Sequence, residues 1–182
     1  MPFEKKQYDI VLIEPPNKYL VERWDQPNFP AIGVAYIGNY LEKKTNITSA
    51  IIDGKLGRQT VQKTIDEAVA LKPKIIGISA MTHIVNVAAF ISSEIKKKLP
   101  NVITVLGGFH ATFLPEKTLK EFPTFDYVSV GEGEIAWSKF ANAILNKTGS
   151  TENIKGMWYE KNGTVVSMGR GEIPTTLDEL GE

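Results

Sequence analysis

Five short runs rich in β-branched residues recur along the chain, with helical stretches between them. The runs cover residues 9–13, 49–53, 74–79, 102–106 and 126–130. Each run is almost continuously apolar rather than alternating between apolar and polar residues, which is typical of parallel strands covered on both faces. The stretches between and after the runs predict helices over residues 32–44, 61–71, 84–99, 115–122 and 135–145.

The order of these elements predicts an α/β protein with right-handed crossovers. Five strands with this spacing favour a flavodoxin-like (Rossmann-like) doubly wound five-stranded parallel sheet of order 2-1-3-4-5 over a six-stranded dinucleotide fold. After residue 148 the pattern changes, because two strand-like runs flank Asn162-Gly163, a strong signal for a β-hairpin. We therefore expect an α/β domain at 1–148, and a C-terminal β-hairpin with a linker at 149–182.

Composition excludes several classes of function. The 182 residues include no cysteine, so this chain cannot hold a disulfide, a thiolate zinc site or an iron–sulfur cluster. Lys and Arg total 21 and Asp and Glu total 21, and a net charge of 0 argues against nucleic acid as a partner. No apolar run approaches the roughly 20 residues that cross a bilayer, and the N-terminus is not a signal peptide. A cytoplasmic protein without a membrane partner is the expectation.

The candidate binding residues all follow strands. In an open parallel sheet, ligands bind at the carboxyl ends of the strands. In strand order the candidates are Pro15 and Pro16; Asp53 and Lys55; Ser79, Met81 and Thr82; Gly107, Gly108, His110 and Thr112; and Gly131, Glu132 and Gly133. Turn chemistry alone explains glycines and prolines at strand ends. It does not explain why Ser79, Thr82, His110 and Thr112 fall at the same edge. No catalytic residue and no metal ligand stands out among them.

Several of these residues also have purely structural interpretations. Gly107-Gly108 is compatible with a plain strand-to-helix turn, and Thr82 with the N-cap of the following helix. Glu132 and Glu134 suit the N-terminus of the next helix, where the helix dipole favours acidic residues.

Two alternative functions stay open from the residues alone. Gly131, Gly133 and Ala136 fit the pattern G-x-G-x-x-A between a strand and a helix, which would suit a nucleotide-binding oxidoreductase domain. The match is weak, because it follows the last parallel strand and places two carboxylates near a pyrophosphate. The other alternative is a non-enzymatic α/β interaction module, in which all residues of the edge serve turns and caps.

Seven segments together resemble a known family. They are IEPP, PAIGVAYIGNYLE, IID, PKIIGISAMT, VLGGFHATFLPEKTL, FDYVSVGEGE and GMWYEKNGTVVSMGR. They resemble the N-terminal cobalamin-binding domain of cobalamin-dependent radical SAM enzymes, which include methyltransferases and the anaerobic magnesium-protoporphyrin monomethyl ester oxidative cyclase. The most specific parts are GG-x-H-A-T and GEGE, in the right order and spacing.

The resemblance implies a cofactor, a partner and a set of roles. Cobalamin would bind at the carboxyl edge, while S-adenosylmethionine and a [4Fe-4S] cluster would belong to a radical SAM barrel beyond this chain. The fragment would then not be catalytic alone. The wider class carries D-x-H-x-x-G after the second strand, whereas this chain has Asp53, Lys55 and Gly57. A lysine ammonium has no lone pair, so the resemblance implies base-off binding without a histidine ligand.

The resemblance also implies where the two parts of cobalamin would lie. Ser79-Ala80-Met81 and Gly107-Gly108 are similar to the elements that line the groove for the nucleotide tail, which would also pass Thr82. The corrin ring would lie over the edge near Pro15, Pro16, Lys55, His110 and Glu132.

Overall fold

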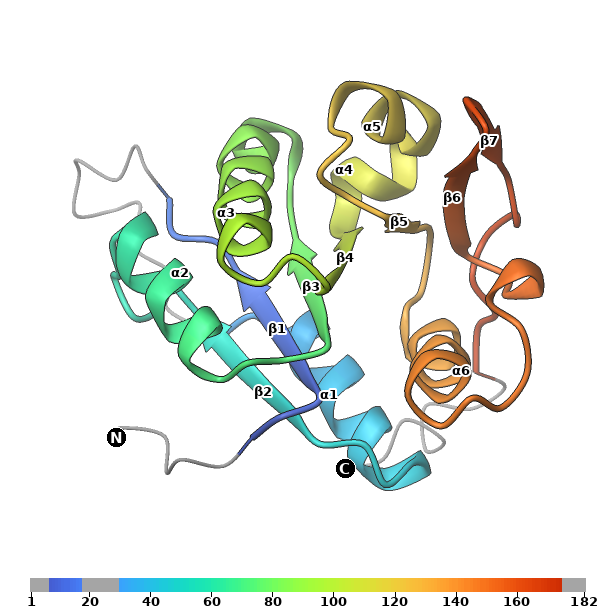
Figure 1. The fold of residues 1–182 in the computed structure, drawn as a ribbon, viewed down its shortest axis with the longest axis horizontal. Helices are drawn as coiled ribbons and strands as arrows, with labels where there is room; N and C mark the ends of the chain where they lie inside the picture. The colour runs from blue at the N-terminus through green and yellow to red at the C-terminus, as the bar shows by residue number, and fades with distance from the viewer. Residues whose placement is uncertain (1–6, 18–29, 175–182) are drawn as a thin grey trace.

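The computed structural model describes residues 7–17 and 30–174 (Figure 1). Part of the predicted linker, from residue 175 onward, lies outside the described residues. The elements, in chain order, are β1 (Ile10–Glu14), α1 (Ile32–Lys44), β2 (Ser49–Asp53), α2 (Val61–Ala70), β3 (Ile75–Ser79), η2 (Thr82–Ile84), α3 (Val85–Lys98), β4 (Ile103–Gly107), α4 (Gly108–Phe113), α5 (Pro115–Glu121), β5 (Tyr127–Ser129), α6 (Glu134–Leu145), η3 (Thr151–Asn153), β6 (Met157–Lys161) and β7 (Thr164–Val166). This alternation confirms the predicted α/β class.

A single seven-stranded sheet has the order β2-β1-β3-β4-β5-β6-β7. Its first five strands are parallel and follow the predicted order 2-1-3-4-5. The predicted hairpin is present, and its turn residues Asn162 and Gly163 both have positive φ, 53° and 78°, as a primed turn requires. The predicted strand number is wrong, because β6 pairs antiparallel with β5 and the hairpin therefore extends the sheet. This pairing covers the edge that the three-residue strand β5 would otherwise expose.

Local sequence signals explain several helix ends. The Thr60 hydroxyl caps α2 by accepting a hydrogen bond of 3.1 Å from the Lys63 N–H, and Pro115 begins α5 as predicted. Two features differ from the prediction. The short helix α4, which begins directly after β4, is not among the predicted helices, and Thr82 begins η2 instead of capping α3.

Helices cover both faces of the sheet (Figure 1). Strand alternation turns Ile10 and Leu12 toward the layer that contains α1 and α6. The intervening residues, Val11 and Ile13, pack on the opposite side with α2 and α3. The candidate site lies at the carboxyl end of the sheet and extends into the α1/α6 side.

Candidate functional site

A cavity of about 540 Å³ opens at the carboxyl edge of the sheet. This size falls in the range of small-molecule and cofactor sites, roughly 300–1,000 Å³. Residues from β1, β2, β3, β4, α1, α4 and α6 line it, together with the loops after β2, β3 and β5 and the segment after β7. The carboxyl ends of the strands thus meet in one hollow, as the topology rule predicts.

The floor of the cavity is made of residues on three neighbouring strands. Strand alternation places Leu12 and Glu14 of β1 on the α1/α6 side, where Gly77 and Ser79 of β3 and Gly107 of β4 also lie. Leu12 is in register with Gly77, and Ser79 is in register with Gly107. Two of these five floor positions, Gly77 and Gly107, have no side chain.

The two floor glycines differ in what an added Cβ would contact. A Cβ at Gly77 would stand 2.5 Å from Cη2 of Trp137 and 2.8 Å from Cδ2 of Leu12, so the indole of α6 already fills that space. A Cβ at Gly107 would meet only the Cβ of Ser129, at an ordinary 3.8 Å. The space above Gly107 thus belongs to the cavity.

Ten of the predicted site residues line this cavity. They are Asp53, Lys55, Ser79, Met81, Gly107, Gly108, Thr112, Gly131, Glu132 and Gly133. The other four, Pro15, Pro16, Thr82 and His110, do not line it. Pro15 and Pro16 are buried, and Pro16 packs against Gly54 at the start of the loop after β2.

His110 points away from the cavity. Its Nδ1 lies 3.2 Å from the Thr82 hydroxyl, and its ring meets the Phe122 ring edge-on at 6.4 Å. The side chain is only 5% exposed, and its Nε2 has no hydrogen-bond partner among the described residues. The geometry therefore does not support the predicted contacts of His110 and Thr82 with a ligand. The first turn of α4 directs the imidazole toward α5 and η2 instead.

We expect His110 to make the protein less stable in acid. Burial lowers the pKa of His110 below its ordinary value of 6.5, so the unfolded chain takes up this proton at a higher pH than the folded chain. The stability that neutral His110 contributes is present above that ordinary value. This contribution is lost as the pH falls toward the pKa of His110 in the folded protein, which is the lower of the two values.

The measurement is the free energy of unfolding in urea from about pH 7.5 to about pH 5. His110→Gln should lose less stability over this interval than the wild-type protein, whereas His83→Gln, at an exposed position, should follow the wild type. If the free energy of unfolding depended on pH identically in all three proteins, His110 would not be the cause of the lower stability in acid.

The cavity carries more acidic than basic side chains. Glu14, Asp53, Glu132 and Glu134 line it, against Lys55 and Arg170. Burial raises the pKa of Glu14, an effect partly offset by the nearby Ser79 hydroxyl and by the charge of Lys55. Burial also raises the pKa of Glu134, and the charge of Glu132 adds to this effect. An acidic lining disfavours the binding of a pyrophosphate group, which is itself negatively charged.

Asp53 has a structural role at the cavity wall. Its Oδ2 accepts a hydrogen bond of 3.0 Å from the Ala31 N–H, and its Oδ1 accepts one of 2.8 Å from the Leu56 N–H. Asp53 thereby joins the start of α1 to the loop after β2. Lys55 also lines the cavity, and its positive charge acts on the carboxyl group of Glu14.

The segment after the hairpin closes one side of the cavity. The Gly171 N–H donates a 2.7 Å hydrogen bond to the Val130 carbonyl, and Gly171 packs directly against the backbone of Glu132. This contact brings Arg170 to the cavity wall beside Gly131. The sequence analysis missed Arg170, because nothing in its local sequence shows that the chain returns to the sheet edge.

The rim of the cavity is apolar and exposed. Ile32, Met81, Phe109 and Phe113 line it while keeping 53%, 51%, 65% and 71% of their surface accessible. Phe109 and Phe113 stack with their ring centroids 6.4 Å apart. Exposed apolar side chains clustered around a cavity mark a binding surface more often than isolated ones do.

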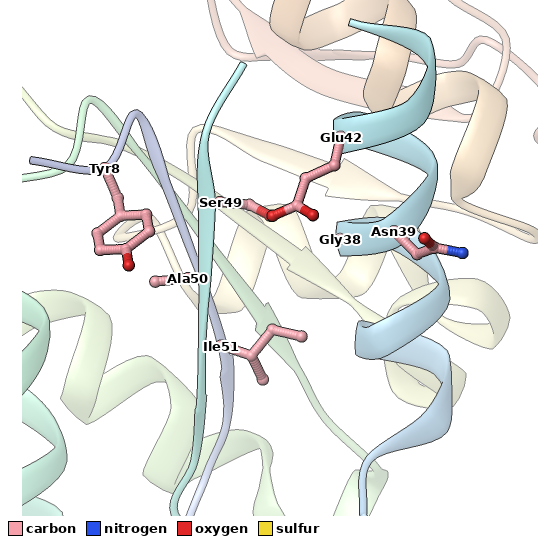
Figure 2. Close-up of a pocket in the computed structure, with 7 residues that line it drawn as sticks. All are labelled: Tyr8, Gly38, Asn39, Glu42, Ser49, Ala50 and Ile51. Carbon is pink, nitrogen blue, oxygen red and sulfur yellow. The ribbon is translucent and has the colours of Figure 1, made fainter. Parts of the chain in front are cut away.

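A second hollow, of about 310 Å³, lies at the opposite end of β2. Figure 2 shows it between α1 and the edge strand β2, and Glu42 is the charged side chain among the described residues that line it. None of the predicted site residues lies there, and we assign it no function.

The described residues give two further findings. No three His, Cys, Asp or Glu side chains among them are grouped so as to hold a metal ion. No helix within residues 7–17 and 30–174 is long and apolar enough to cross a membrane.

A doubly wound sheet with a ligand-sized cavity at its carboxyl edge defines a ligand-binding α/β domain. The sequence profile of the B12 binding domain matches residues 26–141. The chain belongs to the B12-binding domain family. The resemblance to cobalamin-binding domains is thus confirmed.

Two relatives are similar over much of this chain. The uncharacterized methyltransferase PH0819 of Pyrococcus horikoshii is 32% identical over 94% of this chain and 36% of its own length. The anaerobic magnesium-protoporphyrin IX monomethyl ester cyclase of Rubrivivax gelatinosus is 31% identical over 64% of this chain and 21% of its own length. The chain therefore spans about a third or less of these curated relatives.

Solved structures share the fold. The cobalamin-dependent S-adenosylmethionine radical enzyme OxsB, with aqua-cobalamin and S-adenosylmethionine bound, matches 96% of this chain and 24% of its own chain, with a TM-score of 0.79 and 20% identity. The radical S-adenosylmethionine methyltransferase TsrM of Kitasatospora setae matches 93% of this chain and 30% of its own, with a TM-score of 0.72 and 18% identity.

Proposed function

We propose that this domain binds cobalamin base-off, with the corrin ring over the carboxyl edge of the sheet and the nucleotide tail in the cavity between α1 and α6. The observation that carries the proposal is the open space above Gly107. Gly107 is an extended position on the cavity floor that would accept a side chain without a clash, and it is left bare.

The residues present fit this cofactor. The cavity is open at an apolar rim and runs inward over the sheet, which suits a large ring outside and a narrower tail inside. Met81, Phe109 and Phe113 would contact the ring, while Ser79 and Gly107 would lie along the tail. The acidic lining suits a tail with one phosphodiester better than a dinucleotide with a pyrophosphate. The nucleotide-binding alternative at Gly131, Gly133 and Ala136 is therefore the weaker one.

Cobalamin, when bound, would supply methyl-transfer or redox chemistry, and the protein would supply position and electrostatics. We also propose that residues 1–148 form the cofactor-binding part. Residues 149–182 would then lead to a radical SAM barrel in a longer protein, with S-adenosylmethionine and a [4Fe-4S] cluster held there. The relatives, a methyltransferase and a cyclase, and the methyltransferase TsrM among the solved structures support a methyltransferase or an oxidative cyclase as the whole enzyme.

The proposal is tested by titration with aquacobalamin, followed by visible absorption and calorimetry. We expect saturable binding of one cobalamin per chain, and a spectrum that shifts from the base-on to the base-off form. NAD serves as the matched control and should give no heat. Binding of NAD without binding of cobalamin would instead support the nucleotide-binding alternative.

The lower face of the cobalt gives a second test. Lys55 stands where the class motif has histidine, and a lysine ammonium has no lone pair to donate. Since His110 lies outside the cavity, we expect no protein nitrogen on the metal. The electron paramagnetic resonance spectrum of the cob(II)alamin complex should then lack nitrogen superhyperfine splitting, which free base-on cob(II)alamin shows. Triplet splitting in the complex would contradict this, and the variants Lys55→Ala and His110→Ala would identify the donor.

A further inference from the structure

The apolar rim of the cavity comes from two segments that meet at His110. Met81 lies in the loop after β3, while Phe109 and Phe113 lie in α4. With only six residues, α4 is too short to keep a fixed direction through its own hydrogen bonds. Its buried residues are His110 and Ala111, which anchor it to the rest of the domain. The position of the two rim phenylalanines therefore depends on what His110 contacts.

His110 connects α4 to the loop after β3 by two hydrogen bonds. Its backbone N–H donates to the Ala80 carbonyl at 3.1 Å, and its Nδ1 lies 3.2 Å from the Thr82 hydroxyl. Ala80 and Thr82 are the residues on either side of Met81. The side chain of His110 thus joins the two segments of the rim from outside the cavity.

The surroundings of Nε2 indicate which nitrogen of His110 carries the proton. Nε2 is buried and has no hydrogen-bond partner among the described residues. A neutral imidazole has one N–H, and a buried N–H without an acceptor costs more than an unpaired lone pair. The geometry therefore favours the tautomer in which the Nδ1–H donates to the Thr82 hydroxyl and Nε2 keeps its lone pair.

A second proton on His110 would disturb this arrangement. It would create a charged ring with an N–H at Nε2, beside the ring of Phe122 and without an acceptor among the described residues. Burial lowers the pKa of His110 most; on α5, the carboxylate of Glu121 raises this pKa and the ammonium of Lys117 lowers it. The group that faces the ring from η2 is the neutral hydroxyl of Thr82. The charged ring would therefore leave its buried place, and α4 would lose its anchor.

We propose that neutral His110 is a positioning residue that holds the rim in the shape that binds cobalamin, and that a proton on its ring releases the rim. The inference rests on the proposed function, in which Met81, Phe109 and Phe113 contact the corrin ring. His110 does not line the cavity, so it acts on cobalamin through Thr82 and α4. The domain would then hold cobalamin at neutral pH and bind it more weakly in acid.

The first test measures cobalamin binding in variants that remove the link between His110 and Thr82. Thr82→Val keeps the shape of threonine without the hydroxyl, and His110→Leu keeps a buried side chain without the ring nitrogens. In titrations with aquacobalamin at about pH 7.5, each should raise the dissociation constant about five- to tenfold, the effect of one lost hydrogen bond. The double variant should bind no more weakly than either single variant, because both remove the same link. Thr82→Ser keeps the hydroxyl and should bind like the wild type.

The pH profile of binding separates positioning from simple packing. The affinity that neutral His110 supplies is present above its pKa in the folded protein and is lost as the pH falls through that value. Between about pH 7.5 and about pH 5.5, the dissociation constant of the wild type should therefore rise, and His110→Leu should lose this part of the rise. Glu14 and Glu134 of the cavity, whose pKa values are raised, can also take up protons in acid, but both proteins contain them.

Ser92→Ala is the matched control for a lost buried hydrogen bond. The Ser92 hydroxyl lies 2.9 Å from that of Thr124, and neither residue lines the cavity. This variant should keep both the affinity and the pH profile of the wild type. Urea unfolding of the ligand-free proteins shows which variants are folded. Thr82 is exposed, so its two variants test the link even if His110→Leu does not fold.

Three results would overturn this inference while cobalamin still binds to the wild type. They are wild-type affinity in Thr82→Val, effects of Thr82→Val and His110→Leu that add up in the double variant, and a pH profile that His110→Leu leaves unchanged. If the wild-type protein binds no cobalamin at any pH, the proposed function itself fails.

Discussion

Gly107→Val should abolish cobalamin binding while leaving the fold intact. Gly107 has φ −123° and ψ −168°, an extended conformation that valine adopts readily in a strand. Its Cβ would meet only the Cβ of Ser129, at 3.8 Å, and the two methyl groups would project into the cavity. We expect the dissociation constant for cobalamin to rise by about 100-fold or more. The free energy of unfolding should change by less than about 1 kcal/mol, because replacing glycine also restricts the unfolded chain.

A pair of alanine variants controls for the added volume. Gly107→Ala places one methyl group in the cavity and should weaken binding about tenfold, in proportion to its smaller size. Gly38→Ala adds the same group beside Ile51 in the second hollow, 3.4 Å from Cδ1, and should bind cobalamin like the wild type (Figure 2). Calorimetric titration gives the affinities and urea unfolding gives the stabilities. Wild-type affinity in Gly107→Val would show that the tail does not pass over β4.

The sequence was sufficient to predict most of the parallel sheet and much of the cavity wall. The apolar runs predict the strands, and the spacing predicts the order 2-1-3-4-5, which the structure confirms. The convergence of strand ends then brings Lys55, Ser79 and Gly107 together in the cavity, although their contacts with cobalamin stay a prediction. These conclusions depend on topology, which local sequence patterns constrain strongly.

Other residues of the cavity depend on packing, which short patterns do not encode. Trp137 reaches the floor only because Gly77, in the middle of β3, leaves space for the indole. A glycine inside an otherwise β-branched strand is itself a sign of close approach, and it could have pointed to this position. Arg170 carries no such sign, since only the contact of Gly171 with the sheet edge brings it there.

His110 is the opposite case, a residue that its position in the sequence assigns to the site although its side chain does not line the cavity. It follows β4 by only three residues, as a ligand-binding residue would. The short helix α4 then sets its direction, and the imidazole packs on Phe122 rather than facing the cavity. The sequence predicts which loop carries a residue more reliably than it predicts where the side chain points.

Gly108→Val should lower the free energy of unfolding much more than Gly107→Val does. Gly108 has φ +87°, which strains any residue with a Cβ, and that Cβ would stand 2.9 Å from both the N and the O of Ala80. The same Ala80 groups pair with the Gly107 carbonyl and the His110 N–H, at 3.0 and 3.1 Å, so the backbone has little room to yield. We expect the ligand-free protein to lose on the order of 3–5 kcal/mol of unfolding free energy in urea, against less than about 1 kcal/mol for Gly107→Val as the control. A Gly108→Val protein with wild-type stability but no affinity for cobalamin would show instead that this glycine is kept for the ligand and not for the turn.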